Sequence, residues 1–237
     1  MVAHAHAVLS LHHDKELLTK MTTRLLQTSV ENGEQVRPDH LSTIVHAFAA
    51  KLGHCPSELS AVVEHSLPHV INSMKASELV LTVPALALMP SLPKGRHSLV
   101  EAICSACLPK IEVELRYTAV VSLLKAAVHL EYPSAAFWTR AFQACIGSMQ
   151  KVEWEASYVV SFAELAADAW VMVNTCHNLD ADLHVLQTLK HEAFLSVTQQ
   201  WMARPKEFDA HSLGKLATAC LLAEEGALSS LRSELSD

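Results

Sequence analysis

The sequence predicts an all-α protein, an α-solenoid of about five stacked helix pairs, and three observations support this. Apolar residues recur at i, i+3, i+4 and i+7 over long stretches, which is the period of an amphipathic helix. The 237 residues include only 6 Gly and 9 Pro, fewer than a loop-rich or all-β protein carries. Segments of the chain also resemble one another at separations of 38 to 41 residues, which is typical of helical repeats.

The repeat unit contains two helices. The first runs from Leu41 to Ala49 and recurs from Leu79 to Ala87, and each of the two copies ends in Ala-x-Ala. Its form returns at 213–221 and, more loosely, at 120–127. The second helix aligns residues 59–70 with 100–111, and the pairs Leu67-Pro68 and Leu108-Pro109 coincide. Residues 71–75 also resemble 146–151, about two periods later. An ordinary helical bundle remains the alternative to a solenoid.

Breaks between the helices coincide with Pro and Gly, which stop a helix, and with Ser, which can begin the next one. Such breaks lie at 56–57, 93–95 and 133–134. We expect a single domain over 1–237, with capping helices in 1–37, repeats in 38–223 and an acidic, solvated end at 224–237. The helices expected in order are 14–30, 38–52, 57–74, 76–90, 96–111, 114–131, 134–150, 155–173, 181–201 and 209–223.

Charge and cysteine usage restrict the function. The net charge of -7 argues against a strongly basic nucleic-acid binder, although a local basic strip remains possible. The six cysteines are scattered through apolar helical patterns, so we interpret them as reduced and mostly buried thiols. The longest apolar stretch, 79–92, contains Pro84 and is too short to span a bilayer.

The motifs that could carry catalysis or a metal are weak. Cys104-x-x-Cys107 has no second cysteine pair, so we interpret both as core thiols. We interpret His65 and His69 as a surface or partner-facing pair and not as a zinc-protease motif, because Ser66 replaces the Glu that such a motif requires. Glycine-rich phosphate loops and nucleophile elbows are absent. We therefore expect no enzyme activity, no cofactor, no metal and no small-molecule substrate. The tryptophans should fill gaps between helices: Trp138, Trp154, Trp170 and Trp201.

Units of the form Leu-x-x-Ile-x-x-Ala-Phe-Ala, followed by a helix ending in Leu-Pro-x-Val or Ile-x-Ser-Met, resemble degenerate helix-pair repeats of organellar RNA-metabolism proteins. The nearest families are the heptatricopeptide and octotricopeptide proteins and the helical region of RAP-domain proteins. The resemblance covers 38–152 well and 153–223 loosely, and a RAP domain is not evident. It implies a mitochondrial protein, with plastid and cytoplasm as alternatives. Such a protein binds single-stranded RNA or joins protein subunits of an organellar ribosome or RNA-processing complex.

Candidate RNA contacts follow from the repeat. Lys75, Lys110 and Lys151 each fall at the end of the second helix of a unit, and equivalent positions of a solenoid form one edge. Arg140 and His69 lie nearby in the repeat, so the five residues could follow a phosphate backbone. Alternatively, the lysines simply complement the negative ends of helix dipoles. The competing function is a purely protein–protein scaffold, favoured by the acidic charge and the high apolar content.

Overall fold

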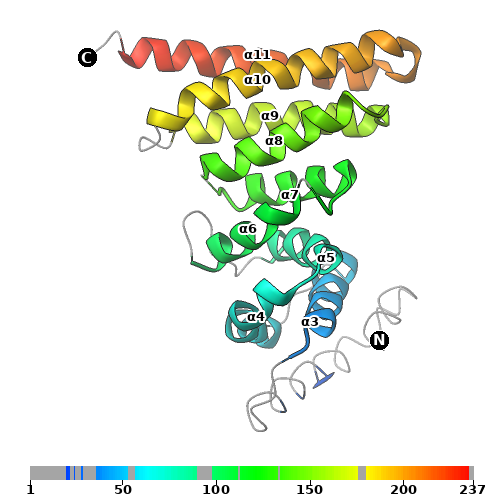
Figure 1. Ribbon diagram of the computed structural model, residues 1–237, viewed down its shortest axis with the longest axis vertical. Helices are drawn as coiled ribbons and strands as arrows, with labels where there is room; N and C mark the ends of the chain where they lie inside the picture. The colour runs from blue at the N-terminus through cyan, green and yellow to red at the C-terminus, as the bar shows by residue number, and fades with distance from the viewer. Residues whose placement is uncertain are drawn as a thin grey trace. The chain divides into compact units, whose positions relative to one another are not determined.

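The computed structural model describes residues 20, 21, 24, 28, 36–52, 57–89, 98–111, 113–132, 134–175 and 180–234, and all regular structure among them is helical (Figure 1). This confirms the all-α prediction for the described part of the chain. The chain divides into two compact units, Met1–Lys110 and Ile111–Asp237, which are described separately. Most of the helix expected at 14–30 lies outside the described residues, but the four described positions within it are helical.

In the first unit, α3 (Pro38–Val45) continues without a break into the π-helix η2 (His46–Leu52). The unit then contains α4 (Ser57–Val70), the 3-10 turn η3 (Ile71–Ser73), α5 (Ala76–Ala87) and α6 (Ser98–Ile111), whose last residue falls in the second unit. Helices α3 and η2 pack against α5. The buried side chains of these three elements include Leu41, Val45, Phe48, Leu79, Val83 and Leu86.

The two Leu-Pro pairs occupy equivalent places in their helices. Helix α4 ends two residues after Pro68, and α6 ends two residues after Pro109. Proline lacks an N–H group and disturbs the turn before it, so it favours termination of the helix soon afterwards. Leu67, which precedes Pro68, is buried, and Leu108, which precedes Pro109, is half-buried. The alignment of α4 with α6 thus extends from sequence to helix geometry.

The second unit consists of α7 (Tyr117–His129), α8 (Ala135–Met149), α9 (Ala156–Thr175), α10 (Asp180–Ala203), the 3-10 turn η4 (Pro205–Glu207) and α11 (Ala210–Glu234). Helix α9 packs against both α7 and α11, while α10 packs against α8 and α9 (Figure 1). The core of the second unit is rich in fully buried aromatic rings, among them Phe137, Trp138, Trp154 and Phe162.

The expected helices within the described residues are present, with three differences in detail. The second half of the helix expected at 38–52 is π-helical, with wider turns than an α-helix. Helix α10 extends to Ala203 and is followed by η4. The expected end of the last helix at 223 is wrong, because α11 continues to Glu234 through most of the segment interpreted as an acidic cap. Glutamate and leucine are good helix formers, and no Pro or Gly stops the helix after Gly226.

The turn between α7 and α8 is a Schellman motif with an unusual residue. The N–H of Tyr132 donates to the carbonyl of Ala127, and the N–H of Glu131 donates to the carbonyl of Val128. Glu131 has a φ of 53°, in the left-handed region where glycine is normally found. The carbonyl of Tyr132 then accepts a hydrogen bond of 2.8 Å from the buried indole of Trp138. The turn is thereby fixed to the first turn of α8.

This geometry predicts opposite effects for two substitutions at one position. Glu131→Gly removes the whole side chain, including the Cβ that makes a positive φ unfavourable. Glu131→Ala removes the side chain beyond the Cβ and therefore keeps this steric cost. The glycine variant should exceed the alanine variant in free energy of unfolding by about 1 kcal/mol. Urea denaturation of both variants measures the difference. Equal stability of the two variants would contradict the strained turn.

Candidate nucleic-acid interface

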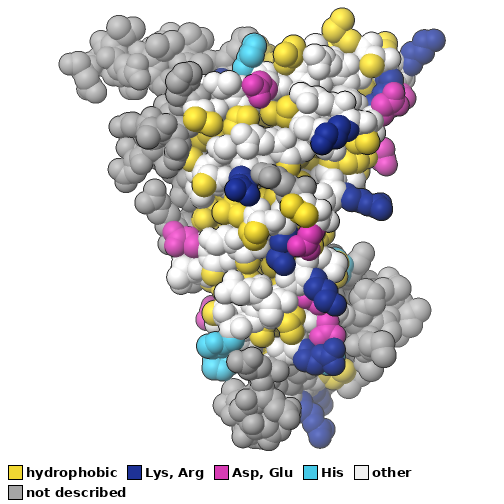
Figure 2. Space-filling view, in the orientation of Figure 1, with side chains coloured by type: hydrophobic (Ala, Val, Ile, Leu, Met, Phe, Trp, Pro, Cys, Tyr) yellow, Lys and Arg dark blue, Asp and Glu magenta, His cyan; other side chains and the backbone are white. Residues whose placement is uncertain are grey.

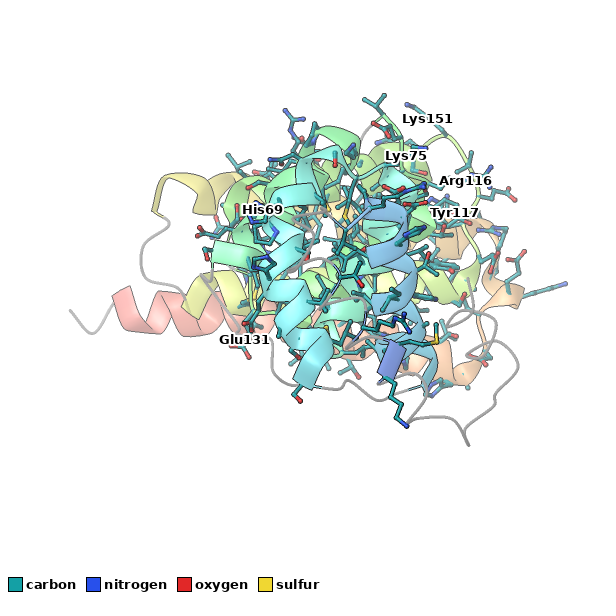
Figure 3. The ribbon with its side chains drawn as sticks, turned by 90° about the horizontal axis from the view of Figure 1, so that it is seen from below. His69, Lys75, Arg116, Tyr117, Glu131 and Lys151 are labelled. Atoms are coloured by element: carbon teal, nitrogen blue, oxygen red, sulfur yellow. The ribbon has the colours of Figure 1, made fainter. Side chains whose placement is uncertain are left out.

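The structure divides the five sequence-predicted contacts between the units. His69, Lys75 and Lys110 belong to the first unit, and Arg140 and Lys151 belong to the second. Within the first unit, Figure 3 separates His69 from Lys75. The single edge through all five residues therefore remains a prediction.

Lys75 occupies a different position from the one predicted. It directly precedes α5, and its backbone N–H donates to the carboxylate of Glu78 at 2.7 Å. It thus lies at the positive end of a helix dipole, where a cation is not favoured. Lys110, in contrast, lies in the last turn of α6, as the dipole explanation expects.

A cleft in the second unit places Lys151 beside another cation. It has a volume of about 720 Å³ and lies between the start of α7 and the second half of α8. Its lining residues are Ile111, Leu115, Arg116, Tyr117, Val120, Gln143, Ala144, Gly147, Ser148, Lys151 and Val152. Arg116 and Lys151 are the only charged side chains among them, and Figure 3 shows both on the side where Tyr117 lies. The lining thus combines an apolar wall with positive charge.

Both cations are available to a ligand. Arg116 and Lys151 are exposed, and in the described part of the chain neither forms an ion pair. Arg140 lies on the same side of α8, since it precedes Ala144 by four residues and Gly147 by seven, but it does not line the cleft. The described lining of the cleft therefore carries two positive charges and no acidic side chain, which favours a positive local potential.

The backbone of α7 adds to this potential. Arg116 is the residue before the first turn of α7, its side chain forms no capping hydrogen bond, and that turn contains no acidic residue. Helical hydrogen bonding begins with the N–H groups of Ala119 and Val120, so those of Tyr117 and Thr118 have no intrahelical acceptor. Free N–H groups and the helix dipole favour an anion at this end of α7.

An aromatic ring forms part of the same cleft. The half-buried Tyr117 stacks on the fully buried Trp154, with ring centroids 4.3 Å apart and an interplanar angle of 18°. It also meets Tyr158 edge to face at 5.7 Å. These contacts fix the Tyr117 ring in one orientation. A cleft with cations and a fixed ring has the two features with which proteins bind single-stranded nucleic acid, phosphate contact and base stacking.

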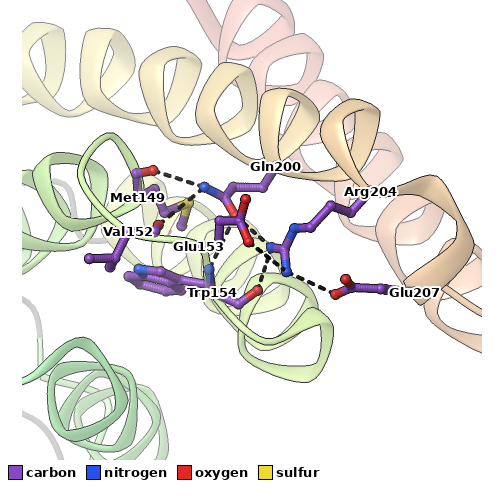
Figure 4. Close-up of polar contacts among 7 residues, drawn as sticks. All are labelled: Met149, Val152, Glu153, Trp154, Gln200, Arg204 and Glu207. Atoms are coloured by element: carbon purple, nitrogen blue, oxygen red, sulfur yellow. Dashed lines mark hydrogen bonds and ion pairs between the residues drawn. The ribbon is translucent and has the colours of Figure 1, made fainter.

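The loop that carries Lys151 is held by the end of α10 (Figure 4). The Gln200 amide donates to the carbonyls of Met149 and Val152 at 2.8 and 3.4 Å, and its oxygen accepts from the backbone N–H of Trp154 at 3.2 Å. Arg204 donates to the carbonyl of Trp154 at 2.6 Å. These side chains satisfy the carbonyl of Met149, the last residue of α8, and the carbonyls of Val152 and Trp154 in the loop that follows.

Further polar contacts orient the guanidinium of Arg204. It donates to Gln200 at 2.9 Å and to the carboxylate of Glu207 at 2.8 Å, and Glu153 lies 4.0 Å away. The arginine side chain is only 17% exposed, whereas the side chains of Glu207 and Glu153 are 50% and 77% exposed. Gln200 and Arg204 together fix the backbone on either side of Lys151 and Val152.

A larger cleft in the same unit lacks this charge pattern. It has a volume of about 770 Å³ between α7, α9 and α11. Its cations are matched by acids, and Lys215 forms an ion pair of 3.2 Å with Glu164. Burial, and then the nearby Glu164, raise the pKa of Asp168. The smaller cleft is therefore the better candidate for an anionic ligand.

Arg116 was missed by the sequence prediction, although a signal for it exists. Arg37, Lys75 and Arg116 each directly precede a helix, α3, α5 and α7 respectively, at spacings of 38 and 41 residues. These spacings match the predicted repeat. The pattern ends at α9, where Glu155 holds this position, and Arg37 is paired with Asp39 at 2.9 Å.

The other motifs have structural roles. Cys104, Cys107 and Cys145 are buried, as predicted. Burial raises the pKa of Cys107 to about 12, with Lys110 acting in the opposite direction, so the thiol stays protonated at neutral pH. His65 and His69 are exposed, with ring centroids 6.0 Å apart.

Three of the tryptophans fill the core as predicted, but Trp201 is 36% exposed. Among the described residues, no cluster of three or more His, Cys, Asp or Glu side chains could hold a metal ion. The described helices also include none that is both long enough and apolar enough to cross a bilayer.

Comparisons with protein families, with curated proteins and with solved structures find no match to this chain.

The loop contacts predict a measurable loss of stability. Gln200→Leu should lower the free energy of unfolding by about 2 kcal/mol, because it leaves the Met149 carbonyl and the Trp154 N–H without their partner. The neighbouring Gln199 is exposed, so Gln199→Leu is a matched control that should change stability by less than about 0.5 kcal/mol. Urea unfolding followed by tryptophan fluorescence measures both. Similar losses for the two variants would contradict the role of Gln200.

Proposed function

We propose that this chain is a non-catalytic helical-repeat protein of organellar RNA metabolism, which contacts single-stranded RNA within an RNA–protein assembly. The observation that carries the proposal is the convergence of Arg116, Lys151 and the start of α7 on one cleft. Neither cation has an ion-pair partner among the described residues. The mitochondrion is the proposed location, on the resemblance of the repeats alone.

The proposed architecture is an α-solenoid of helix pairs. In the second unit, α9 packs between α7 and α11, and α8 packs against α10, which is the pattern of consecutive helix pairs in two layers. In the first unit, the matching Leu-Pro ends of α4 and α6 favour the same repeat. A repeat array presents one equivalent position per unit, and such arrays bind extended ligands.

Phosphate contact by the cleft is consistent with the acidic net charge. The chain carries -7 overall, yet binding depends on the local potential, and the described residues of the cleft lining include two cations and no acid. Two phosphate contacts produce a weak interaction at physiological salt. This fits a protein that contributes to RNA binding within an assembly.

Charge reversal in the cleft should weaken RNA binding. The variant Arg116→Glu/Lys151→Glu should lower affinity for a single-stranded oligonucleotide at least about tenfold at low salt. It should also reduce the slope of log K against log salt by about 0.7 for each lost phosphate contact. Fluorescence anisotropy with a labelled oligonucleotide at several salt concentrations measures both quantities.

Lys125→Glu provides the matched control, because this exposed lysine of α7 lines the other cleft. Lys125→Glu changes the net charge by the same amount as either of the two cleft substitutions alone. It should leave the affinity for the oligonucleotide within about twofold of that of the unmodified chain. Equal weakening by the control, or binding with no salt dependence, would contradict phosphate contact at the cleft.

A protein–protein scaffold without RNA contact is the second candidate, because large apolar side chains are exposed on α10 and α11. Leu195 is 51% exposed, Met202 70% and Leu221 61%. Figure 2 shows hydrophobic side chains reaching the surface at the end of the view where these helices lie. Purification from native cells separates the candidates. A partner set retained after ribonuclease treatment, without ultraviolet-crosslinked RNA, would favour the scaffold.

A further inference from the structure

Gly147 occupies a place in α8 that neither the backbone nor the packing explains. Its φ lies outside the left-handed region, and a Cβ added here would meet no atom within 4 Å among the described residues. Glycine is also, after proline, the least favourable residue in a helix, because it loses the most conformational freedom on folding. Gly147 lines the cleft that contains Arg116 and Lys151, so any side chain at this position would take space from the cleft. The glycine therefore keeps this space open.

Tyr117 borders the same cleft from α7. One side of its ring is covered by Trp154, whose ring centroid lies 4.3 Å away. Tyr117 is only half-buried and lines the cleft, so the remaining ring surface is available to a ligand. An aromatic ring held in place binds flat ligands by stacking, and every nucleobase offers a flat π-face. Tyr117 thus suits a base rather than a phosphate.

Gln143 supplies an unused amide at this cleft. It precedes Gly147 by about one helical turn and also lines the cleft. The side chain is exposed, and its amide forms no hydrogen bond with any residue that the structure describes. An amide presents a donor and an acceptor side by side, and glutamine uses this pair to bind the edge of a nucleobase. Such edges are accessible in single-stranded RNA, whose bases can be splayed out of the stack.

The order of these groups along α8 matches the order of groups in a nucleotide. Gln143, Gly147 and Lys151 follow one another at intervals of four residues, so an amide, an open position and a cation lie in one row. A nucleotide likewise presents a base edge, a flat ring system and a phosphate in sequence. The cleft volume of about 720 Å³ falls within the range of about 300 to 1,000 Å³ that is typical of small-ligand sites. One nucleotide therefore fits the cleft by size and by chemistry.

We propose that one unstacked nucleobase of the RNA enters the cleft beside Gly147, stacks on Tyr117 and is recognised along its edge by Gln143. This inference rests on the proposed function, and it adds a site for the base to the phosphate contacts of Arg116 and Lys151. The chain then distinguishes RNA sequences at this nucleotide, and Gln143 is the residue that determines the preference.

Filling the space beside Gly147 tests the base site. Fluorescence anisotropy compares a labelled single-stranded RNA with an abasic strand of the same length and charge. The unmodified chain should bind the RNA at least about fivefold more tightly than the abasic strand, because stacking adds to phosphate contact. Gly147→Leu should abolish this difference, since the new side chain occupies the space, and should keep the salt dependence that Arg116 and Lys151 cause.

Gly214→Leu is the matched control for this substitution. Gly214 lines the larger cleft, and a Cβ added there also meets no described atom within 4 Å. The control should keep the preference for RNA over the abasic strand within about twofold of that of the unmodified chain. Leucine favours a helix more than glycine does, so thermal unfolding should show neither variant to be less stable than the unmodified chain.

Replacing Gln143 separates recognition of the base edge from stacking. The unmodified chain should bind oligo(A), oligo(C) and oligo(U) with affinities that differ by at least about fivefold, because a bound amide discriminates among bases. Gln143→Leu should reduce this spread to within about twofold and preserve the tighter binding of RNA than of the abasic strand. Gln199→Leu removes an exposed amide of α10 outside the cleft, and it should leave the ranking of the three strands unchanged.

Failure of the base site is distinguishable from failure of RNA binding. Equal affinity of the unmodified chain for RNA and for the abasic strand would overturn the base site and leave the proposed function intact. Equal effects of Gly147→Leu and Gly214→Leu, or of Gln143→Leu and Gln199→Leu, would also overturn it. No binding of either strand would overturn the base site and the proposed function together. A preference for RNA that only Gly147→Leu removes, with a base ranking that only Gln143→Leu levels, would support the proposal.

Discussion

The burial of Trp154 is the constraint on which the second unit depends. Its ring stacks on Tyr117 of α7, its indole N–H donates to Ser148 of α8 at 3.2 Å, and its backbone binds Gln200 of α10 and Arg204, the residue after α10. One residue in the loop before α9 thereby contacts α7, α8 and α10. A tryptophan buried in this way contributes both apolar area and specific geometry. The hydrophobic effect drives the helices together, while the polar contacts select one arrangement among many compact ones.

The same residue links the core to the proposed RNA contact. Tyr117 can face the cleft in a fixed orientation because Trp154 supports its ring from the core side. Lys151 lies three residues before Trp154, in the loop that Gln200 and Arg204 hold. The cleft thus rests on buried structure although its two cations are exposed. Preorganisation of this kind lowers the conformational entropy that a ligand must overcome.

Helices of this chain could be predicted from the sequence because their signals are local. Apolar periodicity and the breaks at Pro and Ser located α7 and α8 to within a few residues. The polar network could not be predicted, since Gln200 and Arg204 lie 46 and 50 residues from Trp154 and are ordinary polar residues in sequence. Arg116 could have been found, because it repeats Lys75 after one period. The burial of Cys104 and Cys107 was predicted correctly, because apolar residues surround both in a helical pattern.

The most direct test of the account is to map where RNA touches the protein. The chain is irradiated with a single-stranded oligonucleotide, digested, and the crosslinked peptides are identified by mass spectrometry. We expect crosslinks at Tyr117, whose ring lines the cleft beside Arg116 and Lys151, and we expect them to be lost at high salt. Crosslinks confined to other residues, or no crosslink at all under conditions that label a known RNA-binding protein, would contradict it and leave the protein scaffold as the function.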